Sequence, residues 1–434
     1  MTWITPPSSC TGLFMRMQSK SRLMKKRMTD EKDAAAGNAL LTVLRTALNG
    51  YQPLDEKPNW DRLADMAKQQ ALAAIFYEGA AQYPEFLQWD PDKRKALAEK
   101  AVFDVTGQMR RTEVFLRIYR ILLREGLRPL VLKGLVCRSL YGKFADYRPS
   151  ADEDLLIPKG QFPKCREILL ANGFGQEQNL PDETVAEKLQ AISFYDTQGS
   201  GLTLEIHQNP FGLDSPQCAR LSEYYENAAD HAILHYLNGN PIYSLPHTDH
   251  YLFLFYHLYK HFIHSGVGIR QILDLMLYGQ SFYEEIHWDE VAKKVRELSA
   301  ETLYADVLEL GKRAGFSADS LFRPMNPDML LEDMLQAGVF GASNEAQHYS
   351  SYVTRSSLKS GDFHLLRTLF PSKQYLLAGY PYLEKHPYLL FWVWIRRLIA
   401  FIFRKKQMKN AKSSLTIGRR RIKLFQKYRL IQKK

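Results

Sequence analysis

Two aspartates spaced as on a β-strand are the residues of this 434-residue chain whose chemistry is easiest to infer. Asp152 and Asp154 stand in the run Asp-Glu-Asp-Leu-Leu-Ile at 152–157, whose apolar end is typical of a core strand. Because side chains alternate between the faces of a strand, both aspartates point the same way. Two carboxylates on one face repel each other and require a cation or a shared proton. Oxygen ligands of this kind suit Mg²⁺, which binds a few carboxylates together with substrate phosphates.

A third carboxylate lies in another predicted strand, the run Leu-Thr-Leu-Glu-Ile-His at 202–207. Alternation places Glu205 and His207 on one face and the leucine and isoleucine side chains on the other. If the two strands are neighbours, Asp152, Asp154 and Glu205 converge. Such a cluster can hold two metal ions about 3.5–4 Å apart for an in-line phosphoryl displacement. An Asp-x-Asp pair is also common at solvated strand ends, and that reading stays open.

The segments around these acids predict a mixed α and β unit of roughly a hundred residues. Residues 35–126 read as helical and end at Glu125-Gly126. The predicted order after that is a strand at 128–132, a helical turn or two at 135–141, a loop at 142–150, a strand at 152–157, a helix at 161–172, and two strands at 192–195 and 202–207 around a Gly-Ser-Gly turn. From His247 the pattern is helical again to about residue 345.

We therefore divide the chain into five segments. They are a basic leader at 1–34, a helical region at 35–126, a core at 127–246, a second helical region at 247–387 and a basic tail at 388–434. The leader does not resemble a signal peptide, because lysines and arginines stand where its apolar segment should follow. The four cysteines form no Cys-x-x-Cys pair, so a zinc ribbon is not expected, and isolated cysteines fit a cytoplasmic protein.

The net charge of +11 is concentrated at the two ends of the chain. Residues 388–434 hold 15 Lys/Arg and no acidic residue, whereas residues 31–387 hold 37 basic and 46 acidic residues, a net charge of −9. An acidic body argues against a nucleic-acid groove across it, and favours contact of residues 404–434 with RNA or an anionic surface.

The aromatic run from Tyr388 to Phe403 allows three readings: an interfacial membrane helix, an RNA contact, or packing against the body. We expect it to pack on the body and the final residues to form a solvated tail. No run of about 18 uncharged apolar residues exists, so no transmembrane segment is predicted.

Histidines recur at helical spacing in the second helical region. His250, His257, His261 and His264 fall on one face, with Lys260 beside them. The stripe can pack between helices, contact a polyphosphate or bind zinc, although no further ligand completes a usual zinc set. Arg270 and Asp274, spaced i, i+4, are expected to pair with each other.

Taken together, these segments resemble the nucleotidyltransferase superfamily with the DNA polymerase β-like fold, and within it a bacterial group of uncharacterised nucleotidyltransferases. The matching segments extend over most of 59–400 and are a strand leading into Lys133-Gly134, Arg148-Pro149-Ser150-Ala151 before Asp152, Leu204-Glu205-Ile206-His207, the pair of His257 and His261 with Lys260, and Gly268-Ile269-Arg270 with Asp274. The resemblance implies an α+β fold in which a nucleotidyltransferase-type mixed sheet is flanked by N- and C-terminal helical regions.

The resemblance also implies roles for single residues. Asp152 and Asp154 would bind Mg²⁺ or Mn²⁺, and Glu205 would bind the catalytic ion. An acceptor hydroxyl would attack the α-phosphate of an NTP, and pyrophosphate would leave. The residues expected to contact the nucleotide are Lys133, Gly134, Arg148, Ser150, His257, Lys260 and His261.

Three departures from the superfamily pattern stand out. Lys133-Gly134 replaces a Gly-Ser or Gly-Gly turn, and the third acid is Glu205 where Asp is commoner. Glu153 stands where the superfamily has an apolar residue, and should point away from the metals. Two other functions remain open: a catalytically inactive binding protein that keeps the fold, and an RNA-binding module that acts through the basic tail.

Overall fold

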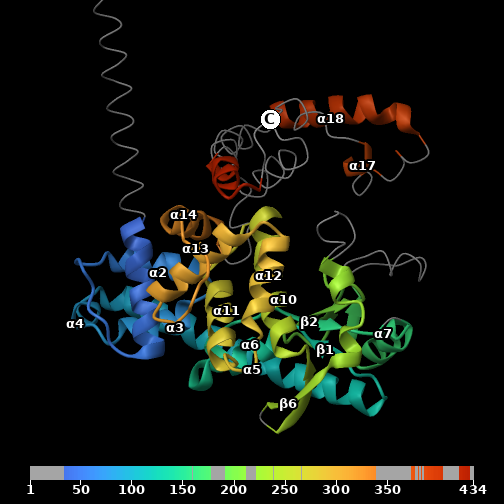
Figure 1. Cartoon of the computed structure of the whole chain (residues 1–434), viewed down its shortest axis with the longest axis horizontal. Helices are drawn as coiled ribbons and strands as arrows, with labels where there is room; N and C mark the ends of the chain where they lie inside the picture. Colours follow the sequence, from blue (N-terminus) through green and yellow to red (C-terminus); the bar gives the residue numbers. More distant parts are fainter. Residues whose placement is uncertain are drawn as a thin grey trace, which may run out of the picture.

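The computed structural model describes residues 34–158, 160–176, 191–211, 221–237, 239–264, 266–338, 373–376, 380, 383, 386–403 and 420–430. Within these residues the chain is a mixed sheet flanked by helices (Figure 1), as the sequence predicts. The leader before residue 34 and the residues at 339–345 lie outside the described part.

The N-terminal region is helical, as predicted. A helix over residues 34–49 is followed by α2 (Trp60–Gln69), α3 (Ala73–Ala80), α4 (Pro84–Leu87) and α5 (Pro91–Arg124). The Asn59 side chain caps α2 by accepting from the Arg62 N–H at 3.1 Å. Asp90 caps α5 in the same way, and α5 ends at Glu125 before Gly126, which has a φ of +80°. The long helix α5 crosses the lower part of Figure 1, with only the β6 hairpin drawn below it.

The central sheet has five strands in the order β1-β2-β5-β4-β3. Their bounds are β1 (Leu130–Val131), β2 (Asp152–Leu156), β3 (Phe174–Gln176), β4 (Ala191–Asp196) and β5 (Thr203–His207). β2 runs parallel to β5, and the other neighbouring pairs are antiparallel. The two acidic strands are thus direct neighbours, which is the condition that the sequence analysis set for convergence of the three acids.

Short helical elements connect the strands. They are α6 (Leu135–Ser139), η1 (Gly142–Tyr147) and α7 (Phe162–Ala171). The prediction of a loop over 142–150 is wrong for residues 142–147, which form a 3₁₀ helix with Phe144 buried against the core. The polar and glycine residues of this segment obscured the contacts that Phe144 and Tyr147 make with the core.

Sequence analysis missed three strands. β3 is only three residues long, and β6 (Ile233–Leu237) and β7 (Asn240–Ser244) form a separate hairpin. The hairpin lies beside β1, because the Tyr119 hydroxyl of α5 donates to Pro129 O at 2.7 Å and accepts from Tyr243 N at 3.0 Å. The Asn-Gly pair before β7 was an available hairpin signal.

The C-terminal half is helical, as predicted, and packs into the same core as the sheet. Its helices are α10 (His247–His264), α11 (Ile269–Ser281), α12 (Trp288–Glu297), α13 (Glu301–Arg313) and α14 (Pro327–Ala337). The aromatic α10 is buried along most of its length. It carries the histidines that the sequence analysis singled out.

The aromatic run was expected to pack on the body, and this expectation is wrong for three of its residues. Helix α18 (Leu390–Phe403) contributes Val393 to a small separate cluster with Leu376 of α17 (Lys373–Leu376), apart from the main core. Tyr388 is 71%, Phe391 60% and Trp392 65% exposed. Among the described residues no helix is both long and apolar enough to cross a membrane.

The expectation of a solvated tail is wrong for residues 420–430. Phe425 and Tyr428 join the main core, and Tyr428 donates to Asp306 Oδ2 at 2.7 Å. Arg421 is 1% exposed and pairs with Asp333 of α14 at 3.2 Å. The acidic body thus binds the basic end of the chain. The other tail residues, 404–419 and 431–434, lie outside the described part.

Candidate functional site

The two parallel strands bring the three predicted acids to one cavity. Asp154 stands opposite Glu205, and Asp152 stands opposite Thr203. Asp152, Asp154 and Glu205 all line a cavity of about 390 Å³ between the sheet and helices α10 and α11. The sequence therefore predicted correctly which acids share a face. Their catalytic role stays a prediction.

A histidine completes the acidic cluster. His207 Nε2 lies 3.0 Å from Asp154 Oδ1 and 3.6 Å from Glu205 Oε2, and its side chain is 3% exposed. Ligand atoms of Asp154, Glu205 and His207 all lie within 4.8 Å of one another. Sequence analysis put His207 on the right face but did not count it as a ligand, although its position two residues after Glu205 was the signal.

Lys133 supplies the positive charge between the two aspartates. Its Nζ lies 3.2 Å from Asp152 Oδ2 and 2.9 Å from Asp154 Oδ2, and the side chain is 15% exposed. His257 Nε2 is 3.4 Å from the same ammonium. The residue that was expected to meet the nucleotide therefore also binds the carboxylates themselves.

The charges of the cluster shift one another's pKa. Lys133 lowers the pKa of Asp152, and burial opposes this. Burial alone would raise the pKa of Asp154, but Lys133 and His207 together lower it. Burial and the neighbouring Asp154 raise the pKa of Glu205. The two aspartates are thus ionised at neutral pH, and Glu205 is the acid most easily protonated.

Glu153 points away from the cavity, as predicted, and its buried charge has partners. It pairs with Arg138 and accepts from the Leu135 N–H at 2.8 Å. Gly134 has a φ of +57°, and a Cβ there would lie 1.9 Å from Glu153 Oε2. Any larger residue would therefore displace this carboxylate. The Glu153 carboxylate can be buried at this core position because Arg138 pairs with its charge and the Leu135 N–H of α6 donates to it.

Gly134 and Ser150 do not line the cavity among the described residues. The Ser150 Oγ donates to Asp152 O at 2.7 Å, and the Ser150 N–H donates to Gln108 Oε1 at 2.7 Å. The structure thus places Ser150 as a support for the start of β2. The predicted contacts of Gly134 and Ser150 with the nucleotide remain untested.

The expected pair of Arg270 with Asp274 is not the arrangement found at the cavity wall. Asp274 binds Arg148 in a bidentate pair, with Nε to Oδ1 at 2.7 Å and Nη2 to Oδ2 at 2.6 Å, and also accepts from Tyr141 at 2.9 Å. Arg270 donates to Pro149 O. Both arginines line the cavity, but Arg148 is held by α11 as a structural clamp on the loop before β2.

The histidine stripe divides into two parts. His257, Lys260 and His261 line the cavity, as their predicted role requires. His250 is fully buried and stacks on Tyr278 with ring centroids 4.7 Å apart, so it packs between helices instead. Helical spacing alone could not separate the two groups, because the stripe passes from the core to the cavity.

The two cavity histidines are neutral at neutral pH. Burial, and then the Lys133 charge, lower the pKa of His257 well below its usual value and that of His261 to about 3. His257 Nε2 lies 3.2 Å from His261 Nε2. Neutral imidazoles can accept from Lys133 or from a substrate hydroxyl without adding charge to the cavity.

The cavity therefore combines an acidic floor with basic walls. Lys133, Arg148, Lys260 and Arg270 stand around the carboxylates of Asp152, Asp154, Glu205 and Asp274. A polyanion that arrives together with a divalent cation matches this distribution of charge.

Comparison with known proteins agrees with this geometry. A family model described as uncharacterised nucleotidyltransferase matches residues 56–313. The chain belongs to this family. The match covers α2 to α5, the whole sheet and the helices through α13, so it includes every residue of the acidic cluster. It ends well before the predicted limit near residue 400. Searches of curated proteins and of solved structures found no match.

Proposed function

We propose that this protein transfers a nucleoside monophosphate from an NTP to an acceptor hydroxyl, with release of pyrophosphate. The observation that carries the proposal is the convergence of Asp152, Asp154 and Glu205 in one cavity of a chain that belongs to a nucleotidyltransferase family. The acceptor oxygen forms a bond to the α-phosphorus, the bond from that phosphorus to the bridging oxygen breaks, and the hydroxyl proton is lost.

The donor set fits a divalent cation. Two carboxylates and an imidazole offer ligand atoms within 4.8 Å of one another, and Asp152 adds a further carboxylate beside Asp154. Oxygen-rich sites suit Mg²⁺ and Mn²⁺, and an imidazole is also compatible with Mn²⁺. Asp152, Asp154, Glu205 and His207 would hold the ion or ions. A bound divalent cation neutralises phosphate charge and makes a coordinated hydroxyl more acidic.

The chain's own basic residues would orient the triphosphate. Lys133, Lys260 and Arg270 bring positive charge to the cavity that the carboxylates line. Preorganised charges of this kind stabilise the charge that develops on the transferring phosphoryl group, and fixed geometry lowers the entropic part of the barrier. Arg148 acts indirectly, because its pair with Asp274 fixes the loop that leads into β2.

Pyrophosphate release tests the activity. The full-length protein is incubated with each labelled NTP, with Mg²⁺ or Mn²⁺ and with candidate hydroxyl acceptors. We expect metal-dependent release with at least one NTP, and a rise in melting temperature with metal and NTP together, since a ligand that binds only the folded state stabilises it. No release and no thermal shift with any of the four NTPs would exclude the proposal.

One observation favours an inactive nucleotide-binding fold as the second candidate. The Lys133 ammonium pairs with both Asp152 and Asp154, so a positive charge of the chain itself can occupy the place of a metal ion. In that case NTP would raise the melting temperature equally with and without Mg²⁺, and no pyrophosphate would appear. The third reading, RNA binding through the tail, loses part of its support because Arg420 and Arg421 are paired with Glu332 and Asp333.

A further inference from the structure

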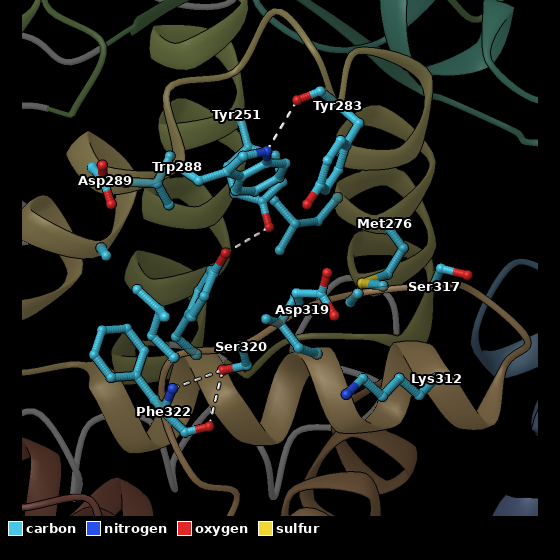
Figure 2. A pocket seen from close by; sticks show the side chains of 18 residues that line it. Tyr251, Met276, Tyr283, Trp288, Asp289, Lys312, Ser317, Asp319, Ser320 and Phe322 are labelled. Carbon is cyan, nitrogen blue, oxygen red and sulfur yellow. Dashed lines mark hydrogen bonds between the residues drawn. The ribbon is translucent and has the colours of Figure 1, made fainter.

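A second cavity, of about 410 Å³, lies among the C-terminal helices (Figure 2). It uses a different face of α11 from the acidic cavity. Arg270 and Asp274 line the acidic cavity, whereas Met276 and Gly279 line the second one. Its size falls within the range of about 300–1,000 Å³ that is typical of small-molecule sites.

The lining of this cavity is rich in aromatic rings. They come from α10, α12, α13 and the two loops beside them, and are Tyr251, Tyr283, Trp288, Tyr304 and Phe322. We call this set the aromatic cage. The Trp288 ring centroid lies 5.1 Å from that of Tyr251 and 5.2 Å from that of Tyr283.

Three polar atoms of the cage are bonded within the protein. The Tyr251 and Tyr304 hydroxyls lie 2.9 Å apart, and Trp288 Nε1 donates to Tyr283 O at 3.0 Å (Figure 2). Tyr251, Tyr304 and Trp288 therefore contact a ligand mainly through their ring carbons. A ligand with many hydrogen-bond donors would leave them unsatisfied.

Gly279 brings the cage close to α11. A Cβ at this position would lie 2.9 Å from Tyr251 Cε2 and 3.4 Å from Trp288 Cη2. Glycine inside a helix costs about 1 kcal/mol relative to alanine. The close approach of both rings to the helix gives this glycine a structural reason.

Charged groups at the cage are mostly acidic. Asp289 and Asp319 line the cavity with one cation, Lys312, and Figure 2 shows Asp319 projecting among the lining side chains. Aromatic faces carry negative charge density and attract cations, as does a carboxylate.

We propose that the aromatic cage binds an organic cation with an alkylated ammonium group. Such a group has few or no N–H donors, so it does not need the hydroxyls that the cage has already bonded, and its methyl groups fit against ring faces and Met276. Asp319 supplies the opposite charge. This site is independent of the proposed nucleotidyl transfer.

Choline and its uncharged isostere 3,3-dimethylbutan-1-ol test the proposal, because they share a shape and differ in charge. Binding of each to the full-length protein is measured by isothermal titration calorimetry at low salt. We expect choline to bind at least about tenfold more tightly than the neutral alcohol, as a desolvated cation–π contact contributes about 2 kcal/mol or more.

Two substitutions at exposed charged residues that line the cavity beside the aromatic cage should act in opposite directions. Asp319→Asn should weaken choline binding about fivefold, and Lys312→Met should tighten it, since both change charge and neither removes a buried side chain. Asp92→Asn, at an exposed acid near the start of α5, is the matched control and should change nothing.

In the wild type, choline should change the tryptophan fluorescence by contact with Trp288. Trp288→Phe keeps an aromatic ring and removes the indole, so choline should still bind this variant without that fluorescence change. The proposal fails if choline does not bind at about 10 mM, a concentration at which a site with a Kd of about 1 mM is nearly saturated. It also fails if choline and the alcohol bind equally, or if Asp319→Asn and Asp92→Asn have the same effect.

Discussion

Removal of the Lys133 ammonium should strengthen divalent metal binding and weaken nucleotide binding. Lys133→Met keeps the length of the side chain and removes the charge that contacts Asp152 and Asp154 at 3.2 and 2.9 Å. In the wild type an incoming divalent cation competes with this ammonium for the same carboxylates. In the variant it does not.

The geometry sets the scale of the effect. Two unit charges about 4 Å apart interact by about 4 kcal/mol at an effective dielectric constant of about 20, and Lys133 makes two shorter contacts. Recovery of only about 1.4 kcal/mol of this attraction corresponds to a tenfold lower Kd for the metal. We therefore expect Mn²⁺ to bind Lys133→Met at least about tenfold more tightly, as measured by electron paramagnetic resonance without nucleotide.

When metal is absent, Lys133→Met should be less stable than the wild type. In Lys133→Met the buried Asp154 and the half-buried Asp152 lose their cation. This should destabilise the fold by about 3–5 kcal/mol, and bound Mn²⁺ should restore most of it. Thermal denaturation with and without Mn²⁺ measures both effects. NTP affinity at saturating metal should fall, because the cavity loses one positive charge.

Lys143→Met is the matched control, since Lys143 is exposed on η1 and contacts the Phe144 ring outside the cavity. It should leave Mn²⁺ affinity unchanged. Equal or weaker Mn²⁺ binding by Lys133→Met, or a variant that stays unfolded in the presence of Mn²⁺, would refute the competition between ammonium and metal.

Three further outcomes follow from the structure. Asp152→Asn and Asp154→Asn should each abolish pyrophosphate release with the circular dichroism spectrum unchanged; full turnover in either would remove that residue from the site. Burial lowers the pKa of His250 to about 3, so the unfolded chain binds its proton first. The contribution of neutral His250 to the free energy of unfolding is complete above pH 6.5 and should fall by about 1.4 kcal/mol per pH unit below that. Denaturant titrations at several pH values should find a smaller slope in His250→Phe. Arg421→Met should lower the free energy of unfolding by about 3–5 kcal/mol, because it leaves Asp333 buried without a cation; an unchanged urea midpoint would contradict this.

The sequence predicted the parts of the site that depend on strand alternation. Asp152, Asp154 and Glu205 share a face because side-chain direction has a period of two, and this follows from spacing alone. That β2 and β5 are neighbours depends on long-range pairing, which the spacing of residues cannot predict. The prediction was met because the strands pair in parallel with Asp154 opposite Glu205.

The sequence could not predict which charges pair with which. Arg270 and Asp274 have the spacing of an intrahelical ion pair, but the bidentate partner of Asp274 is Arg148, 126 residues earlier in the chain. Local spacing contributes only about 0.2–0.5 kcal/mol to such a pair. A buried bidentate contact is stronger and depends on how the loop before β2 meets α11.

The packing of the basic C-terminal segment also depends on pairings that the sequence could not predict. The excess of negative charge on the body and of positive charge on the tail could be read from composition, but not the places where they meet. At 420–430 they meet in the core, where Arg421 pairs with Asp333 and Tyr428 donates to Asp306. Asp333 and Asp306 would each destabilise the fold if they were buried without these partners. Residues 420–430 therefore stabilise the C-terminal helical half of the molecule. Because these charges are neutralised inside the protein, any contact of the tail with an external polyanion must depend on other residues than Arg421.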